Sequence, residues 1–180
     1  MAAAATSPGT SISCGSADLC LNGRRPICQP MTKPIVFILF IVASVSLGVL
    51  SGVSNLPGAW YQSLAKPFFN PPAWIFAPVW TLLYVLIGVA LATTWYDEDN
   101  GGRLTVFAIQ GFLNISWSPA FFGLQSPGLG LAIIIPLLVF ILLFIGMSWR
   151  ANRLAAALFI LYGLWVAFAT ALNLSIVLLN

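Results

Sequence analysis

Histidine is absent from this sequence, and charged residues make up only 6% of it. Without histidine the chain cannot form a Ser-His-Asp or Cys-His catalytic group, a zinc site with imidazole ligands, or a haem centre with a histidine axial ligand. The three cysteines, Cys14, Cys20 and Cys28, are six and eight residues apart, a spacing that matches no common zinc or redox pattern. We therefore predict neither catalytic residues nor a metal site.

The scarcity of charge also defines the class of protein. Globular domains contain about 25% charged residues, whereas 60% of this chain is hydrophobic. Such a composition is typical of an integral membrane protein, since a soluble domain could not solvate so apolar a surface. The net charge of +3 is small and scattered among apolar runs, which excludes the clustered basic face that nucleic-acid binding requires.

The first 32 residues differ from the rest of the chain. They are rich in Ala, Ser, Gly and Pro, carry Arg24 and Arg25, and lack the continuous apolar core of a secretory signal. Three interpretations remain open: a disordered tail, an organellar transit peptide, or a wrongly assigned start, with Met31 as the true initiator. Residues 34–180 are predicted to form the membrane domain.

Five apolar segments follow, each close to the ~20 residues that a helix needs to cross a hydrocarbon core of ~30 Å. Their predicted ranges are about 34–53, 74–95, 104–123, 129–148 and 153–178. The predicted fold class is therefore all-α integral membrane, a five-transmembrane-helix bundle with a long structured loop between the first two helices.

That loop, from about residue 54 to 73, cannot be helical throughout. Pro57, Pro67, Pro71 and Pro72 each remove a backbone donor and clash with the preceding turn. A loop of this length is usually functional or disordered, and its aromatic content argues against disorder. We predict that the loop folds as a lid on the end of the bundle.

Helical spacing brings polar and aromatic residues onto common faces. Trp80 and Tyr84 are four residues apart on the second segment. Gln110, Asn114, Trp117 and Phe121 form a stripe along the third segment. Amides at bilayer depth are expected to face the protein interior.

Small residues form a face of their own on the first segment. Gly48 and Gly52 lie four residues apart, and such a pair lets a neighbouring helix backbone approach closely.

The positive charges predict an orientation. Lys33, Arg103, Arg150 and Arg153 fall on the side of the first segment's start, whereas Lys66 is alone on the other side. The positive-inside rule places the N-terminal side in the cytoplasm of a bacterium, or on the matrix or stroma side of an organellar membrane.

Three groups of residues form a recognisable pattern. The first is Trp60-Tyr61, Leu64, Lys66-Pro67, Pro71-Pro72, Trp74, Phe76, Pro78, Trp80 and Leu83-Tyr84. The second is Asn114 and Trp117 with Phe121-Phe122, and the third is Trp165 and Phe168 with Leu172-Asn173. Over residues 34–180 this pattern resembles the tryptophan-rich sensory protein family, also called the translocator protein or peripheral-type benzodiazepine receptor family.

The resemblance implies a five-helix bundle in the lipid bilayer, often a homodimer, which binds tetrapyrroles such as protoporphyrin IX and haem, and in some members sterols, under its first loop. By the same resemblance, Trp60, Tyr61 and Trp74 belong to the lid. The pocket walls would carry Trp80, Tyr84, Asn114, Trp117, Trp165 and Phe168. No cofactor is required, and the tetrapyrrole is the expected ligand.

Several roles stay open. The favoured function is a membrane receptor or sensor for tetrapyrroles; the alternatives are a transporter of porphyrins or sterols and a light-dependent porphyrin-degrading enzyme. Trp117 and Trp165 would contact the ligand or pack in the core, and Asn114 and Asn173 would face the ligand or join helices. Lys66 would pair with a ligand propionate, or mark the headgroup region by extending toward it.

Overall fold

The computed structural model describes residues 33–180, which contain no β-strand. The elements in chain order are α1 (Lys33–Ser54), α2 (Ala59–Ser63), α3 (Ala73–Trp95), α4 (Gly101–Ser118), the π-helical turn η1 (Pro119–Gly123), α5 (Pro127–Ala151) and α6 (Arg153–Leu179). The predicted N-terminal extension, with Met31 and the three cysteines, lies outside the described residues.

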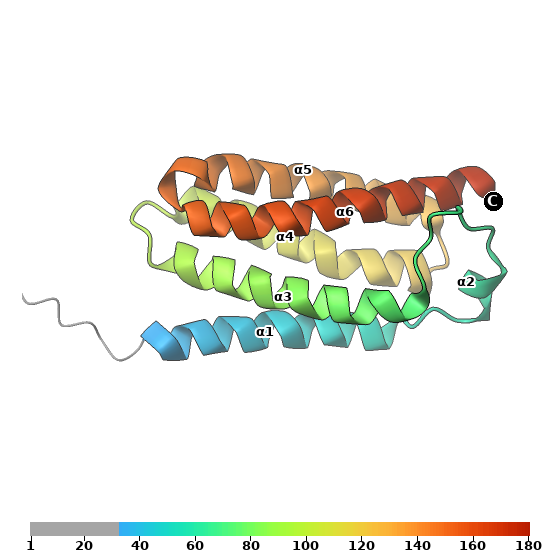
Figure 1. Cartoon of the computed structure of the whole chain (residues 1–180), viewed down its shortest axis with the longest axis horizontal. Helices are drawn as coiled ribbons and strands as arrows, with labels where there is room; N and C mark the ends of the chain where they lie inside the picture. The colour runs from blue at the N-terminus through green and yellow to red at the C-terminus, as the bar shows by residue number, and fades with distance from the viewer. Residues whose placement is uncertain (1–32) are drawn as a thin grey trace, which may run out of the picture. The chain divides into compact units, whose positions relative to one another are not determined.

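The five long helices run side by side as a bundle (Figure 1). They alternate in direction, so that the start of α1, the α3–α4 turn and the α5–α6 turn lie at one end. The loop that contains α2 lies at the other end, together with the end of α6 (Figure 1). α1 is at the edge of the bundle, where it packs mainly on α3.

The predicted all-α class is confirmed, but the number of helices differs from the predicted five. Among residues 33–180 there are six α-helices, because Ala59–Ser63 forms one short turn between the loop prolines. Four of the helices within this described range are long and apolar enough to span a membrane: α1, α3, α5 and α6. α4 falls below that apolarity because it carries Arg103, Gln110 and Asn114, all of which are buried inside the bundle.

The ends of the helices differ from the predicted ranges by a few residues. α4 begins at Gly101 rather than 104, and its α-helical part ends at Ser118, where η1 continues the chain to Gly123. α5 begins at Pro127 rather than 129, and the side chain of Ser126 caps it by accepting a hydrogen bond from the Leu129 N–H at 3.3 Å.

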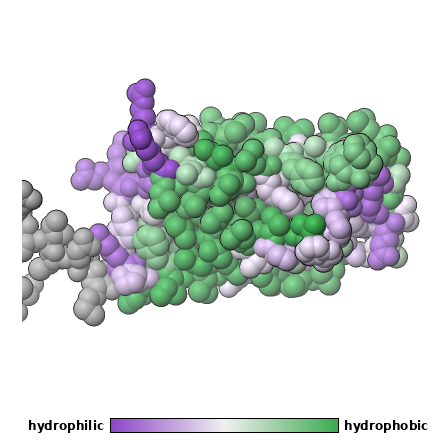
Figure 2. Space-filling view, viewed as in Figure 1, coloured by the Kyte–Doolittle hydropathy of each residue, from purple (hydrophilic) through white to green (hydrophobic). Residues whose placement is uncertain are grey.

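The surface has the pattern that a bilayer requires. On the face seen in Figure 2, hydrophobic residues cover the middle of the bundle and hydrophilic residues gather toward its two ends. Large apolar side chains stand exposed within the helices, among them Leu50, Phe112 and Leu164. Their exposure is explained when lipid tails, rather than water, surround the middle of the bundle.

Small residues bring α1 and α3 close together. A Cβ added to Gly88 of α3 would lie 2.6 Å from the Cα of Ile41 and 2.9 Å from the carbonyl oxygen of Phe40. Gly88 therefore sets the approach of the two backbones. Gly48 of α1 meets the ring of Tyr84 instead of a backbone, and Gly52 faces open space. The predicted pair of glycines thus has two different environments.

An ion pair fastens the end of the bundle opposite the lid. Arg103 donates a hydrogen bond from Nη1 to Asp97 Oδ2 at 2.7 Å, and its side chain is only 5% exposed. Asn152 donates to the same carboxylate oxygen at 2.9 Å. Asn152 also caps α6, because its Oδ1 accepts from the Ala155 N–H at 3.0 Å. These contacts join the α3–α4 turn to the start of α6.

Candidate ligand-binding cavity

A cavity of about 780 Å³ lies inside the lid end of the bundle. Its walls come from α1, α3, α4, η1 and α6, and the loop between α1 and α3 lies over it. Five of the nine residues that the resemblance assigns to the site line this cavity: Tyr61, Trp80, Tyr84, Asn114 and Trp117. The structure therefore brings together residues that are up to 56 positions apart in the sequence.

The aromatic walls consist of two stacked pairs. On α3 the rings of Trp80 and Tyr84 lie 5.7 Å apart at an interplanar angle of 30°. In the second pair, Trp117 of α4 stacks on Phe121 of η1, with 5.1 Å between the ring centroids and an interplanar angle of 24°. All four rings line the cavity. The helix–π-turn junction at Pro119 keeps Phe121 close to Trp117, and Phe121 is only 2% exposed.

The lid packs its aromatic residues onto the same cluster. Trp60 and Tyr61 of α2 contact the ring of Phe121 edge-on, at 6.0 and 6.1 Å between ring centroids. Tyr61 also meets Phe122 at 5.3 Å. Burial raises the pKa of the Tyr61 hydroxyl. The hydroxyl therefore keeps its proton at pH values where an exposed tyrosine would begin to lose it. Of these two residues only Tyr61 lines the cavity, and Trp60 supports the lid from outside it.

An asparagine amide holds the lid loop to the end of α6. Asn180 accepts a hydrogen bond from the Ala65 N–H at 2.9 Å and donates one to the Ala65 carbonyl at 3.1 Å. The same amide donates to the Ile176 carbonyl at 2.9 Å. Ala65 immediately precedes Lys66, which lines the cavity. The two hydrogen bonds between Asn180 and Ala65 therefore hold this part of the loop against the end of α6, next to the cavity.

A chain of hydrogen bonds crosses the floor of the cavity. Tyr84 Oη donates to Asn114 Oδ1 at 2.8 Å, and Asn114 Nδ2 donates to Tyr162 Oη at 2.7 Å. Tyr162 in turn donates to Gln110 Oε1 at 3.2 Å. Gln110, Asn114 and Tyr162 are all buried. The amides therefore face the interior, as their spacing predicts, and their hydrogen bonds join α3, α4 and α6.

A second polar contact orients one tryptophan. Trp117 Nε1 donates to Asn173 Oδ1 at 3.2 Å, and Asn173 Nδ2 donates to the Pro127 carbonyl at 2.8 Å. Asn173 is 2% exposed and lines the cavity together with Trp117. The indole plane of Trp117 is thereby fixed from its nitrogen as well as by its stacking on Phe121.

Three of the other expected site residues lie away from the cavity wall. Trp74 is in the first turn of α3 and is 73% exposed. Trp165 packs behind Phe76, at 6.0 Å between ring centroids, and Phe76 is the residue that lines the cavity. Phe168 lies between Trp165 and Phe69 of the lid loop. Trp165 and Phe168 thus support the wall and the lid from behind.

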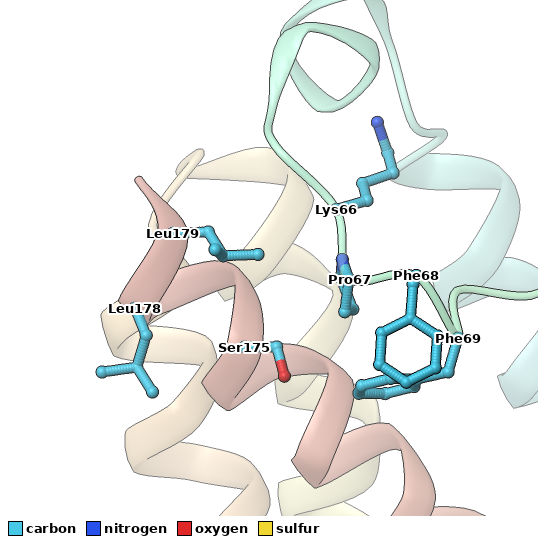
Figure 3. A pocket seen from close by; sticks show the side chains of 7 residues that line it. All are labelled: Lys66, Pro67, Phe68, Phe69, Ser175, Leu178 and Leu179. Atoms are coloured by element: carbon cyan, nitrogen blue, oxygen red, sulfur yellow. The ribbon is translucent and has the colours of Figure 1, made fainter.

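A smaller groove of about 420 Å³ lies outside the lid, between the loop and the end of α6. Figure 3 shows the residues that line it, which are Lys66, Pro67, Phe68 and Phe69 of the loop and Ser175, Leu178 and Leu179 of α6. Phe68 is fully exposed. In the same view, the Lys66 side chain turns away from Leu178 and Leu179 (Figure 3).

Comparison with known proteins identifies the family. The model of the TspO/MBR family matches residues 37–179. The chain belongs to this family. The match includes most of α1 and every element from α2 to α6, and therefore all residues that line the cavity. Together with the four apolar helices, membership of the TspO/MBR family establishes an integral membrane protein with several spans.

Individual relatives cover most of the membrane domain. The Tryptophan-rich protein TspO of Chlorobaculum tepidum is 43% identical over 129 residues, which cover 69% of this chain and 82% of the relative. The Tryptophan-rich sensory protein of Cereibacter sphaeroides is 32% identical over 145 residues, covering 81% and 91%. The Translocator protein of Homo sapiens is 32% identical over 158 residues, covering 79% and 89%.

Two residues of the TspO/MBR site were not among those expected from the sequence: Phe121 lines the cavity, and Tyr162 completes the hydrogen-bond chain beneath it. Asn173, for which a ligand-facing role was one of two alternatives, also lines the cavity. Phe121 follows Trp117 by four residues, so the stripe on the third segment contains a signal for it. The contact between Gly48 and the ring of Tyr84 could not be read from the sequence, because it depends on how α1 packs on α3.

Proposed function

We propose that this TspO/MBR protein is a membrane receptor that binds a planar tetrapyrrole in the cavity beneath its lid. The observation that carries the proposal is the pair of stacked aromatic walls, Trp80 with Tyr84 and Trp117 with Phe121. A flat conjugated ring gains stacking or edge contacts with such faces, each worth about 0.5–1.5 kcal/mol beyond the buried area. The names of the relatives, a sensory protein and a translocator, agree with ligand binding.

The size of the cavity supports a ligand of this class. At about 780 Å³ it lies in the upper part of the range of roughly 300–1,000 Å³ that small-molecule sites occupy. Its lining is mostly apolar, with a few polar groups such as Asn114, Thr81 and Asn173. That distribution favours a large, flat and mainly hydrophobic molecule over a sugar or a nucleotide.

The donor set favours a metal-free porphyrin over haem. The chain has no histidine. Of the two tyrosines on the cavity wall, Tyr84 already donates its hydroxyl to Asn114, and burial raises the pKa of Tyr61, which keeps its hydroxyl protonated. A haem would therefore be held by stacking and hydrogen bonds rather than by a strong axial ligand. Protoporphyrin IX needs no axial ligand, so the same walls suffice for it.

We also assign α4, continued by η1, as a fifth crossing. Gly101–Gly123 spans 23 residues in the two elements and runs alongside the four apolar helices (Figure 1). Its polar residues Arg103, Gln110 and Asn114 are buried in the bundle, so they do not meet the lipid.

A titration with protoporphyrin IX tests the function. Purified protein in detergent is titrated while the porphyrin absorbance band and the tryptophan fluorescence are recorded, first in the dark and then under illumination. We expect a saturable shift of the absorbance band with stoichiometric quenching. The absence of saturation would disprove the receptor function, and protein-dependent bleaching under light would replace it with the degrading enzyme.

A pair of variants then tests the site. Trp117→Phe removes a stacked indole and its hydrogen bond to Asn173, and it should weaken binding. Trp149→Phe is the matched control, because Trp149 is 57% exposed near the end of α5 away from the lid. Equal affinity of Trp117→Phe and the control would place the porphyrin elsewhere on the protein.

A further inference from the structure

Lys66 is the one charged side chain on the cavity wall among the described residues. Its ammonium group donates to the Gln62 and Leu64 carbonyls, both at 3.2 Å. It also lies 4.8 Å from the centre of the Tyr61 ring, a cation–π contact. The side chain is half-buried, and its ammonium group lies over the lid helix α2. Lys66 is thus held at the cavity by three contacts.

None of these contacts balances its charge. Within residues 33–180 the acidic side chains are Asp97, Glu98 and Asp99, all in the turn at the opposite end of the bundle. Asp97 is already paired with Arg103, and Lys66 forms no ion pair within this part of the chain. Carbonyl oxygens and a ring face orient an ammonium group but leave a net positive charge.

The apolar walls around Lys66 strengthen the attraction between its positive charge and an anionic ligand. The cavity beneath Lys66 is lined mainly by apolar and aromatic side chains, including Phe76, Trp80 and Leu172. Opposite charges attract more strongly beside such low-dielectric walls than in water. An anionic group on a ligand would therefore be stabilised most strongly at Lys66. The deeper part, between Tyr84 and Trp117, offers only neutral groups.

We propose that Lys66 selects ligands that carry a carboxylate and sets their orientation. The acidic edge of the ligand lies at the lid, against the ammonium group of Lys66, and the apolar edge lies deeper, between Tyr84 and Trp117. The ligand class is accordingly a flat, amphiphilic carboxylic acid. This inference rests on the proposed tetrapyrrole function, since it specifies how a porphyrin with two propionates enters the cavity.

Comparison of an acid with its ester isolates the charge. Protoporphyrin IX and its dimethyl ester have the same ring, but only the acid carries carboxylates. Wild-type protein in detergent should bind the acid about tenfold more tightly or better, the factor expected of a charge-assisted hydrogen bond. Lys66→Met retains an unbranched side chain without the charge, and it should lose this preference by weakening the acid alone. Lys66→Arg should keep the preference.

Controls separate the possible outcomes. Arg153→Met removes a positive charge at the opposite end of the bundle, where α6 begins, and it should leave both affinities unchanged. Equal wild-type affinity for acid and ester, or equal weakening of both by Lys66→Met, would overturn the role of Lys66 while leaving the receptor function in place. Saturable binding of neither porphyrin would overturn the receptor function, and this inference with it. A circular dichroism spectrum identical to wild type shows that each variant is folded.

Discussion

The ring of Tyr84 lies directly against the α-carbon of Gly48. A Cβ on Gly48 would overlap the ring atoms Cε2, Cδ2 and Cζ of Tyr84. Tyr84 cannot turn aside without cost, because its hydroxyl donates to Asn114 and its ring stacks on Trp80. The absence of a side chain at Gly48 therefore leaves the space in which Tyr84 can both stack on Trp80 and donate to Asn114.

Substitution of Gly48 by alanine should accordingly destabilise the protein and perturb the cavity. Overpacking of this kind typically costs about 1–3 kcal/mol. We expect a lower midpoint of thermal unfolding, followed by circular dichroism in detergent, and weaker porphyrin binding. The control is Gly52→Ala, one turn later on the same helix, where the added methyl meets nothing within 4 Å. That variant should be neutral or slightly stabilised, by at most about 1 kcal/mol, because alanine favours the helix. Equal midpoints for the two variants would contradict the assigned contact.

Removal of the Tyr162 hydroxyl should break the buried chain in its middle. Tyr162→Phe leaves Asn114 Nδ2 and Gln110 Oε1 without the partner that each has now. An unsatisfied buried polar group costs about 1–3 kcal/mol, so the free energy of unfolding should fall by an amount in this range. Ser116→Ala is the control, because Ser116 donates only to the Phe112 carbonyl of its own helix. A loss no larger than that of the control would show that the chain contributes little to stability.

The lid should open more often when Asn180 is replaced. Asn180→Ala removes both hydrogen bonds to Ala65, so the loop from Pro57 to Pro72 should exchange its amide hydrogens faster, with little change in the helices. The rate of porphyrin dissociation should rise as well. Ser175→Ala serves as the control on the same helix, since its hydroxyl bonds only to the Ala171 carbonyl. Unchanged exchange in the loop would show that aromatic packing on Phe121, rather than Asn180, holds the lid.

Local patterns predicted what depends on one segment at a time. Proline positions indicated that the loop is not a continuous helix, and the spacing of Gln110 and Asn114 indicated an interior face; both amides are indeed buried. The family was recognised correctly from motif residues in three segments. The short helix Ala59–Ser63 inside the loop was not predicted, because a single turn leaves almost no periodic signal between prolines.

Contacts between segments could not be predicted from such local patterns, because they depend on how the helices pack. Trp165 and Phe76 both belong to the residue pattern of the family, but only the helix packing decides that Phe76 lines the cavity and that Trp165 lies behind it. Asn180 and Ala65 are 115 positions apart, and no periodicity links them. The environment of Gly48 likewise depends on the register of α1 against α3, which hydrophobic composition leaves undetermined.

The ion pair at the other end of the bundle yields a prediction that is independent of any ligand. Asp97→Ala leaves Arg103, whose side chain is 5% exposed, buried without a counter-charge, and it also removes the acceptor of Asn152. Loss of one partner of a buried pair costs about 3–5 kcal/mol, whereas replacement of both by apolar residues is often neutral. Because Asp97 itself is 24% exposed, we expect a loss near 3 kcal/mol, the lower end of that range.

The double variant distinguishes the pair from its individual residues. Asp97→Ala with Arg103→Met should unfold at a higher temperature than Asp97→Ala alone, since the stranded guanidinium group is gone and the methionine side chain fits a buried position. Glu98→Ala, in the same turn but exposed, should match wild type. If the double variant is no more stable than Asp97→Ala, then the destabilisation comes from the lost contact between Asp97 and Asn152, and the charge of Arg103 is solvated by the membrane interface rather than neutralised by Asp97.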